Sequence, residues 1–397
     1  MDKIKIFIVY HYLYPDDVVS SLHFTQLALE LKKKGYIVET LSSNRSCRKS
    51  RQNYSKYEVK WNIHFNRSWR PDFAQSSFFG RIFNSIYLQF SWLIFFLKRK
   101  FLIKDKIDHI ILGTDPIFLH LIIIPLKFLF PKTKFILWSF DLYPDAYIAK
   151  KNIKNIFLLK PIIAITKYAY GKFNHIVDIG QCMREKILKY GKYNFQTIIP
   201  WSIFEEDNIQ NNFIKSKPLS ILYSGNMGEA HDTLNLIRLI KLLQNNKMIE
   251  FYFSLNNKQK LSFIKALGNK NFNNVKFLDS TINYIQRLKK FDIHLVTLKK
   301  GWEGIVVPSK FFSSLSLGKP ILYVGPKGSS ISYDISRYDL GWTLNIENFD
   351  NEINKFAYEC KSIEILEKKS NNCIVAYNTL YSKKICINKW IKILGKN

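Results

Sequence analysis

The chain has 397 residues, which is more than one typical domain, so two domains of about 200 residues each are expected. Its 60 Lys and Arg against 31 Asp and Glu give a net charge of +29, which favours an anionic partner: nucleic acid, an acidic membrane surface or a phosphorylated substrate. The five cysteines are scattered without a Cys-x-x-Cys pair, which argues against structural zinc and fits reduced thiols in a cytoplasm.

The N-terminal segment predicts a βαβ unit. Ile4–Tyr10 and Tyr36–Leu41 are apolar runs typical of buried parallel strands, and the first of them is too short and too soon polar for a signal peptide. Between them, Leu22–Lys34 has helical periodicity and stops at Gly35. The loop after the first strand, at 14–21, has no glycine, so a dinucleotide site is not expected there.

A basic, aromatic region follows. Within the polar stretch 44–76, the basic residues include Arg45, Arg48, Lys49, Arg51, Arg67 and Arg70. Residues 78–97 are then mostly apolar and are followed by Lys98-Arg99-Lys100. Asn84 and Gln89 interrupt this run, which falls short of the ~20 apolar residues that a membrane span requires. We expect a helix lying in the membrane interface; the alternative is a core helix of the first domain.

Further strands are expected at 108–112, 135–138 and 175–179, and an apolar helix, broken at Pro125, at 117–130. Open α/β sheets place ligands at the carboxyl ends of their strands. Asp141 directly follows such an end and is therefore a site candidate, with helix capping as the alternative. The polar stretch 206–217 is interpreted as a linker.

The second half repeats the strand–helix rhythm. Strands are expected at 219–224, 249–255, 275–278, 293–298 and 321–325, and helices at 233–243, 257–267, 281–291, 352–368 and 374–395. The loop at 225–232 carries Gly225 and Gly228, where backbone amides could approach a phosphate closely.

A second glycine-punctuated loop, Lys300–Pro308, carries Glu303 and leads into a short helix. Pro308 suits the first helical position. The amides of Ser309, Lys310 and Phe311 would then form an anion site. Glu303 beside an anion site suggests a ligand with both a diphosphate and hydroxyl groups, as in a nucleotide sugar. The alternative is an ordinary loop–helix joint with a solvated Glu303.

Two α/β halves of this kind would enclose a cleft, and Lys310 would offset the charge of a leaving diphosphate. No Asp-x-Asp triplet occurs in the sequence, so a carboxylate-held metal is not expected. Walker, Gly-x-Ser-x-Gly and His-Glu-x-x-His motifs are also absent from it. His11, His23, His109 and His120 are as readily structural as catalytic.

The combined motifs resemble family 4 glycosyltransferases of the GT-B fold, and more closely the branch that builds bacterial O-antigen and capsular polysaccharide. In the second half the resemblance rests on Gly225-Asn226-Met227-Gly228, Trp302-Glu303-Gly304, Val307-Pro308-Ser309-Lys310-Phe311 and Gly318-Lys319-Pro320. In the first half it rests on Gly113-Thr114-Asp115-Pro116, Asp141-Leu142-Tyr143-Pro144-Asp145, Cys182-Met183-Arg184 and Ile199-Pro200-Trp201.

The resemblance implies an α/β architecture of two Rossmann-like parallel-sheet domains facing a cleft, with C-terminal helices. An acceptor-binding, membrane-associating domain would span 1–205, a linker 206–217, and a nucleotide-sugar domain 218–378. A terminal helix at 379–397 would pack back on the first domain.

The implied activity is retaining, metal-independent transfer of a hexosyl or N-acetylhexosaminyl group from a nucleotide-diphospho-sugar, with no cofactor. The implied acceptor is a polyprenyl-diphosphate-linked glycan at the inner face of the bacterial cytoplasmic membrane. The implied catalytic residues are Glu303, which would hold the sugar hydroxyls, and Asp141. The donor-binding residues would be Gly225, Asn226, Gly228, Gly304, Val307, Ser309, Lys310 and Ser313, and the acceptor-binding residues Asp115, Ser20 and His23.

The chain departs from the family pattern at several positions. The second glutamate of the family, which grips the nucleotide ribose, falls at Ser313. Glu229 and Ala230 stand where an Arg or Lys usually follows the glycine-rich loop, and Phe140 replaces a common histidine.

Other classes are kept as alternatives. A sugar-nucleotide 2-epimerase of the same fold would work without an acceptor and would need further acid/base groups. A non-catalytic GT-B-like binding protein is favoured by the missing second glutamate. Nucleic-acid binding is suggested by charge alone, and without a recognised motif it is not expected.

Overall fold

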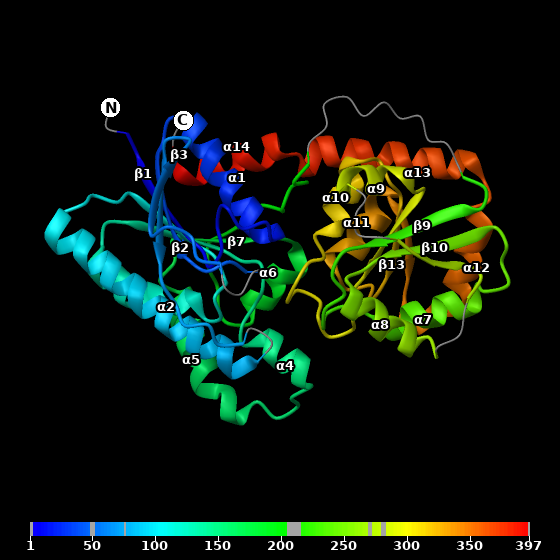
Figure 1. Cartoon of the computed structure of the whole chain (residues 1–397), viewed down its shortest axis with the longest axis horizontal. Coiled ribbons are helices and arrows are strands. Elements are labelled where there is room, and N and C mark those ends of the chain that lie inside the picture. The colour runs from blue at the N-terminus through cyan, green and yellow to red at the C-terminus, as the bar shows by residue number, and fades with distance from the viewer. Residues whose placement is uncertain are drawn as a thin grey trace. The chain divides into compact units, whose positions relative to one another are not determined.

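The computed structural model describes residues 3–47, 52–74, 77–204, 216–268, 272–278 and 283–395. The chain divides into two compact units (Figure 1). The first comprises Met1–Ile199 together with Cys386–Asn397, and the second comprises Pro200–Ile385. The expected linker falls almost entirely on residues outside the described ranges, as do Arg48, Lys49 and Arg51.

The described part of the first unit contains an eight-stranded sheet with the strand order β3-β4-β2-β1-β5-β6-β7-β8. Neighbouring strands are parallel except for the antiparallel pair β3–β4. The strands are β1 (Lys5–Val9), β2 (Ile37–Ser43), β3 (Tyr57–Lys60), β4 (Ile63–Ser68), β5 (His109–Leu112), β6 (Lys134–Trp138), β7 (His175–Asp178) and β8 (Phe195–Thr197). The direction of strand addition reverses between β1 and β5, which is where open sheets of this kind place a ligand.

Helices and helical turns surround this sheet. They are α1 (Val19–Lys33), α2 (Phe78–Lys98), η1 (Arg99–Ile103), η2 (Leu119–Ile122), α3 (Ile123–Leu129), α4 (Asp145–Lys151), η3 (Phe157–Leu159), α5 (Lys160–Tyr170) and α6 (Gln181–Leu188). The last helix of the chain, α14 (Lys383–Leu394), also packs here and is red in Figure 1. The ring of Trp390 lies 5.1 Å from that of Trp138, and the Cys386 thiol donates to the Ile199 carbonyl.

Helix α2 is apolar on more than one side because it has two environments. Leu88, Trp92 and Phe96 are buried, whereas Phe79, Phe83, Ile86 and Phe90 are exposed and recur at i, i+4, i+7 and i+11 on one side of the helix. One side of residues 78–97 therefore packs in the core, as the alternative expected, and the other side faces solvent. Among the described residues, no helix is long and apolar enough to cross a membrane.

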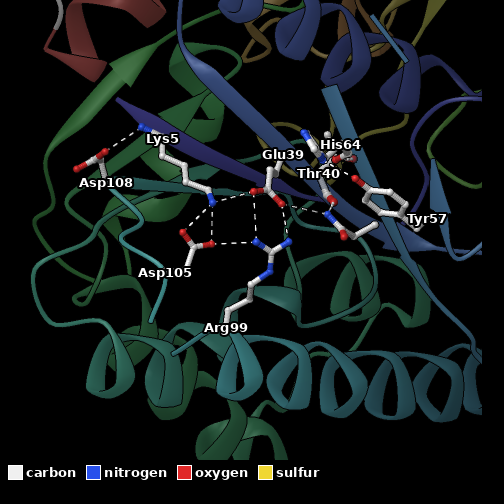
Figure 2. A network of polar contacts seen from close by, with 9 residues as sticks. Lys5, Glu39, Thr40, Tyr57, His64, Arg99, Asp105 and Asp108 are labelled. Atoms are coloured by element: carbon white, nitrogen blue, oxygen red, sulfur yellow. Dashed lines mark hydrogen bonds and ion pairs between the residues drawn. The ribbon is translucent and has the colours of Figure 1, made fainter. Parts of the chain in front are cut away.

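The end of α2 is fixed to the sheet by a network of buried charges (Figure 2). Lys5 Nζ lies 2.8 Å from Glu39 and 2.7 Å from Asp105, and Arg99 lies 2.6 Å from Glu39 and 3.0 Å from Asp105. The four side chains are between 8% and 17% exposed. Arg99, one of the three basic residues that follow the apolar run, therefore has its charge neutralised inside the unit.

The second unit contains, among its described residues, a six-stranded parallel sheet with the order β11-β10-β9-β12-β13-β14. Its strands are β9 (Leu219–Ser224), β10 (Ile249–Ser254), β11 (Val275–Phe277), β12 (Ile293–Thr297), β13 (Ile321–Val324) and β14 (Gly341–Leu344). Its helices and helical turns are α7 (Thr233–Leu242), α8 (Asn257–Ala266), α9 (Tyr284–Lys290), α10 (Lys310–Ser316), α11 (Ser330–Tyr338), η4 (Ile346–Asn348), α12 (Phe349–Glu359), α13 (Ile363–Ala376) and η5 (Tyr377–Tyr381). The direction in which successive strands are added to this sheet reverses between β9 and β12.

The elements differ from the sequence expectations in several places. Residues 57–68 form the hairpin β3–β4 inside the polar, basic stretch, where no strand was expected. Pro125 does not break a helix, because it lies in the first turn of α3, where its missing N–H has no helical partner. The helices expected at 352–368 and 374–395 are divided differently: α12 ends at Glu359, α13 ends at Ala376, and α14 begins at Lys383. Ser362 caps α13 by accepting a hydrogen bond from the Ile365 amide.

Candidate functional site

The two glycine-bearing loops of the second unit meet where its sheet reverses order. One loop follows β9 and the other follows β12, and the Lys299 amide donates to the Ala230 carbonyl at 2.7 Å. Both loops lie at the carboxyl edge of the sheet, because each follows a strand and the two strands, β9 and β12, are parallel neighbours. The loop sequences expected to share a ligand are therefore in contact.

Lys310 joins the start of α10 to the turn after β9. Its Nζ donates to the carbonyl of Asn226 at 3.0 Å and to the hydroxyl of Tyr223 at 3.3 Å, and it lies 4.7 Å from the centre of the Tyr223 ring. Burial lowers the pKa of Lys310 to about 8. Burial and the Lys310 charge together lower the pKa of His231, on the same loop, to about 3, so that imidazole is neutral. A positive charge is thus held against the Gly225–Asn226 turn.

Gly225 and Gly228 serve different purposes. Gly225 has a φ of +114°, and a Cβ there would lie 3.1 Å from Cε of Lys310. Glycine is therefore required both by the backbone conformation and by the close approach of the lysine. A Cβ on Gly228 would meet nothing within 4 Å. Gly228 instead borders a hollow of about 420 Å³, lined by Met227, Gly228, Glu229, His231, Asp232, Thr233, Leu234 and Lys299.

The loop that carries Glu303 is built from two successive turns. The amide of Trp302 donates to the carbonyl of Lys299, and that of Ile305 to the carbonyl of Trp302, both at 3.1 Å. The third residues of these turns, Gly301 and Gly304, have φ values of +90° and +73°, as type II turns require. Trp302 is buried and anchors the loop.

The Glu303 side chain folds back on its own loop. Its Oε2 accepts the amide N–H of Gly301 at 2.6 Å, and no described residue lies in hydrogen-bond distance of Oε1. The Glu303 side chain is half-buried. One oxygen is thus fixed and the other is available to a hydroxyl donor.

The helix after this loop begins later than expected. Ser309 is the N-cap and Lys310 the first residue of α10, so Pro308 lies outside the helix. The amide of Phe311 is used within the turn, since it donates to the Pro308 carbonyl at 3.2 Å, and does not point outward. Val307 precedes this turn. With seven residues in α10, the lysine side chain is a stronger basis for an anion site than the helix terminus.

Ser313, the position of the missing second glutamate, lies on α10 behind Lys310. Together with Ser224 and Ser314 it lines a cavity of about 10 Å³, roughly one water-sized probe. The hydroxyl of Ser224 is buried without a hydrogen-bond partner among the described residues. The carboxylate that the family pattern would place here is thus replaced by small hydroxyl side chains.

The first unit has a polar cluster at the carboxyl ends of β1, β5 and β6. Asp115 Oδ2 lies 2.7 Å from Nδ1 of His11, and the His11 amide donates to the Asp115 carbonyl at 3.0 Å. The Thr114 hydroxyl accepts the amides of Phe140 and Asp141, each at 3.1 Å. These bonds tie the loop that carries Asp141 to the loop that carries Asp115.

The two aspartates have pKa values displaced in opposite directions. Burial raises the pKa of Asp141 to about 6, helped by the Asp115 charge and opposed by Arg81. Burial also acts to raise the pKa of Asp115, but His11, Arg81 and Arg70 outweigh it and leave that pKa below its ordinary value. Arg81, from α2, donates to the Tyr143 hydroxyl at 3.1 Å. At a pH between the two pKa values Asp115 is ionised while Asp141 is protonated, so that one site holds both a carboxylate and a carboxylic acid.

Ser20 and His23 belong to the same region through α1. Ser20 hydrogen-bonds the buried Tyr10 side chain, and His23 Nδ1 donates to the Val19 carbonyl at 2.8 Å. The His23 ring lies 6.0 Å from that of Phe140, the residue before Asp141.

Sequence reasoning left His11 open between a structural and a catalytic role, and it missed Arg81 and Arg70. His11 lies two residues after the buried strand β1, so the strand-end rule that selected Asp141 would also have selected it. Arg81 was not selected as a site residue because the segment 78–97 was considered only as an apolar helix. Among the residues that the structure describes, no group of three or more His, Cys, Asp or Glu side chains could hold a metal.

Comparison with known proteins gives the following similarities. No protein-family model matches the sequence. The chain is 27% identical over 260 residues to a probable glycosyltransferase, WbjE, of Pseudomonas aeruginosa, over 59% of this chain and 62% of that protein. The chain therefore matches less than two thirds of the length of this curated relative.

Solved structures are similar over nearly the whole chain. Sucrose-phosphate synthase from Thermosynechococcus elongatus has a TM-score of 0.71 at 10% identity, covering 98% of both chains. WaaG, a glycosyltransferase of lipopolysaccharide biosynthesis, has 0.64 at 14%, covering 99% of this chain and 100% of that one. HepE of Anabaena, in complex with UDP and glucose, has 0.63 at 11%, covering 98% and 99%. These likenesses confirm the α/β GT-B fold with its two parallel sheets and C-terminal helices.

Proposed function

We propose that the chain is a retaining, metal-independent glycosyltransferase that moves a sugar from a nucleotide-diphospho-sugar to a lipid-diphosphate-linked saccharide. The observation that carries the proposal is Lys310, whose ammonium is held against the Gly225–Asn226 turn at the point where the sheet of the second unit reverses. The GT-B fold and the 27% identity to a probable glycosyltransferase support it. Retention, the lipid-linked acceptor and the absence of a metal rest on the family resemblance.

In this proposal the second unit binds the donor. Lys310 and the turn at Gly225 and Asn226 face the diphosphate, and Gly228 leaves open space beside it. Glu303, with one oxygen fixed by the Gly301 amide, offers the other to the sugar hydroxyls. A preorganised cation at a diphosphate leaving group stabilises charge that develops in the transition state.

The first unit would bind the acceptor through the polar cluster around Asp115 and Asp141. Arg81 connects this cluster to the exposed apolar side of α2, because its side chain bonds Tyr143 while Phe79 and Phe83 lie on the same helix. A lipid-linked saccharide needs both a polar site for its sugar and a nearby membrane surface for its lipid, and α2 serves both.

The proposed membrane-contact surface comprises exposed residues of α2 and η1: Phe79, Phe83, Ile86, Phe90, Phe101, Leu102 and Ile103. Four exposed lysines, Lys98, Lys100, Lys104 and Lys106, adjoin its η1 end. Apolar side chains that enter the interface and lysines that meet anionic headgroups are the two components of interfacial binding. The proposed location is thus peripheral, on the inner face of a bacterial cytoplasmic membrane.

Donor binding is tested by thermal stabilisation with a panel of uridine, guanosine, adenosine and thymidine diphospho-sugars. A ligand at 100 times its dissociation constant stabilises the folded state by about 2.7 kcal/mol. Lys310→Met should lose about half of this stabilisation if it binds about tenfold more weakly, whereas Lys265→Met, which removes an exposed lysine of α8, should keep it. Stabilisation by no member of the panel would contradict the proposal.

Transfer is then measured with the stabilising donor and a farnesyl-diphospho-N-acetylglucosamine acceptor. Glu303→Ala should abolish transfer without changing the melting temperature, because its carboxylate bonds only its own loop among the described residues. The anomeric configuration of the product, read by NMR, tests retention. Undiminished transfer by Glu303→Ala would remove its assigned role.

Membrane contact is tested by sedimentation with vesicles of phosphatidylglycerol and phosphatidylcholine. Phe79→Ser and Phe90→Ser together should reduce binding, and raising the salt concentration should weaken it further. Leu261→Ser is the matched control, since Leu261 of α8 in the second unit is 68% exposed against 72% for Phe79. An equal loss of vesicle binding in the double variant of α2 and in Leu261→Ser would contradict membrane contact through α2.

A sugar-nucleotide epimerase is the second candidate, favoured by the displaced pKa values of Asp115 and Asp141, which could supply an acid and a base. It requires no acceptor. Incubation of the donor alone, followed by analysis for an epimeric sugar nucleotide, separates the two functions.

A further inference from the structure

Helix α2 contacts the loops that follow β5 and β6. The Ser85 hydroxyl donates to the Ile117 carbonyl at 2.5 Å, and Ile117 lies two residues after Asp115 in the loop after β5. At the N-terminal end of α2, the Phe78 ring stacks on the Tyr147 ring of α4, with 4.4 Å between the ring centres. Helix α4 directly follows the loop after β6. One helix thus packs on both loops of the proposed acceptor site.

The other side of α2 belongs to the proposed membrane-contact surface. Phe79, Phe83, Ile86 and Phe90 are exposed there. An α-helix with its side chains is about 10 Å across. A lipid whose chain lies beside these side chains is therefore about one helix diameter from the loops on the inner side.

Arg81 lies on α2 between these two environments. Its Nη2 donates to the Tyr143 hydroxyl at 3.1 Å, and its guanidinium lies 5.8 Å from the centre of the Tyr143 ring. Burial acts to lower the pKa of Arg81, but Tyr143, Asp115 and Asp141 outweigh it, so the guanidinium stays charged. In the described part of the chain, no ion pair joins Arg81 to either aspartate, although both act on its charge.

Most hydrogen-bonding capacity of Arg81 is left over. A guanidinium carries several N–H donors in a planar fork. The bond to Tyr143 uses one of them, and Arg81 has no second hydrogen-bond partner among the residues that the structure describes. The side chain is also half-buried, so it is only partly solvated. A half-buried guanidinium with free donors matches the oxygens of a phosphate group.

We propose that Arg81 binds the diphosphate of the lipid-linked acceptor and makes the chain selective for acceptors that carry phosphate. This inference rests on the proposed transferase function and names the acceptor group that the first unit recognises. The lipid would lie along the exposed side of α2, the diphosphate at Arg81, and the sugar at the cluster of Asp115 and Asp141. Carboxylates repel phosphate, so a neutral sugar suits that cluster better than the diphosphate does.

The alternative role of Arg81 is structural, since its bond to the Tyr143 hydroxyl would by itself fix the loop after β6. A variant at Arg81 loses activity in both cases, so the acceptor has to be varied as well. A structural loss affects every acceptor alike. A lost phosphate contact affects only those acceptors that carry phosphate.

The experiment measures transfer without vesicles, from the sugar nucleotide that stabilises the chain most. The two acceptors are farnesyl-diphospho-N-acetylglucosamine and farnesyl N-acetylglucosaminide, which has the same lipid and sugar but no phosphate. The unaltered chain should have a KM about 10- to 100-fold lower for the diphosphate acceptor, as expected for hydrogen bonds to a charged group. Equal KM values for the two acceptors overturn the proposal while leaving the transferase function standing.

Arg81→Gln should raise the KM of the diphosphate acceptor by about the same 10- to 100-fold factor and leave that of the phosphate-free acceptor nearly unchanged. Arg238→Gln is the control, because it removes an exposed arginine of α7 that pairs with Asp350 at 2.9 Å, and it should keep the full preference. An equal rise of both KM values in Arg81→Gln assigns Arg81 a structural role and overturns the proposal.

Arg81→Lys is the second variant, used also if Arg81→Gln fails to fold. Lysine keeps the charge but not the planar fork, so the preference for the diphosphate acceptor should fall by several-fold without disappearing. An undiminished preference in Arg81→Lys overturns the proposal, because the fork would then contribute nothing.

A phospholipid headgroup offers the same phosphate chemistry, and vesicle binding separates the two sources. Arg81→Gln should sediment with vesicles of phosphatidylglycerol and phosphatidylcholine as the unaltered chain does. Weaker sedimentation together with an unchanged acceptor preference assigns Arg81 to headgroups and overturns the proposal. If the unaltered chain transfers sugar from no member of the panel to either acceptor, the proposed function itself fails.

Discussion

Asp141→Asn should stabilise the protein at neutral pH. The Asp141 carboxyl is partly buried at the end of β6 beside Asp115, and its pKa is raised to about 6 from an ordinary value of 3.8. The folded state therefore prefers the protonated form. Below pH 3.8 the residue costs nothing, and the cost grows as the pH rises until it is complete above pH 6. Asparagine has the same shape and never ionises.

The size of the effect follows from these two pKa values. At 1.36 kcal/mol per pKa unit, the full cost is about 3 kcal/mol, reached near pH 7.5. At pH 4.5 the unfolded chain is already mostly ionised at this position, and the cost is about 1 kcal/mol. The advantage of asparagine over aspartate should therefore grow by about 2 kcal/mol between the two pH values.

Urea unfolding followed by circular dichroism, carried out on both proteins at pH 4.5 and pH 7.5, measures this difference. Any constant effect of the amide on packing cancels when the two pH values are compared. An advantage that is equal at both pH values, or larger at pH 4.5, would refute the raised pKa of Asp141. The expected loss of transfer would show that this destabilising residue is retained for function.

Three further predictions concern the second unit and the charge network. UDP affinity, measured by calorimetry, should fall as the pH rises through about 8 because Lys310 loses its proton, and Lys310→Met should bind about tenfold more weakly at pH 7 without this dependence. Gly225→Ala should lose about 1–3 kcal/mol of stability, whereas Gly228→Ala should melt normally and lose only nucleotide affinity; equal melting of the two would contradict the geometry. Glu39→Gln should lower the free energy of urea unfolding by about 3–5 kcal/mol, since it leaves two buried cations with one carboxylate; a loss under about 1 kcal/mol would mean that water reaches the network.

The strands of both sheets could be predicted because most of them are continuous apolar runs bounded by polar loops. β9 at Leu219–Ser224 matches its expected bounds, and β1 differs by one residue at each end. The hairpin at Tyr57–Ser68 could not be predicted in this way, because polar residues interrupt the apolar positions of both strands and β3 is at the edge of the sheet. Edge strands need no continuous apolar pattern, since one side meets solvent.

The candidate site was predictable only where one short segment carries the signal. Glu303 and Lys310 follow from a loop motif and its spacing. The pairing of Lys310 with Asn226 joins positions 84 residues apart, and that of His11 with Asp115 joins positions 104 apart. Such contacts are set by strand order, which local sequence does not encode. The same applies to Arg99, whose charge looks like part of a surface cluster until Glu39 and Asp105 are placed beside it.

The placement of the last helix makes the second unit an insertion within the first. The first unit includes Cys386–Asn397, so its core around Trp138 is completed by Trp390, close to the end of the chain. During synthesis the second unit can fold as soon as its own residues have emerged, whereas the first stays unfinished until residues 386–397 have emerged. Polypeptide domains commonly fold in order from the N-terminus; here the unit that begins first is completed last. A chain shortened by its final 12 residues should therefore lose the integrity of its N-terminal unit, while residues 200–385 fold without it.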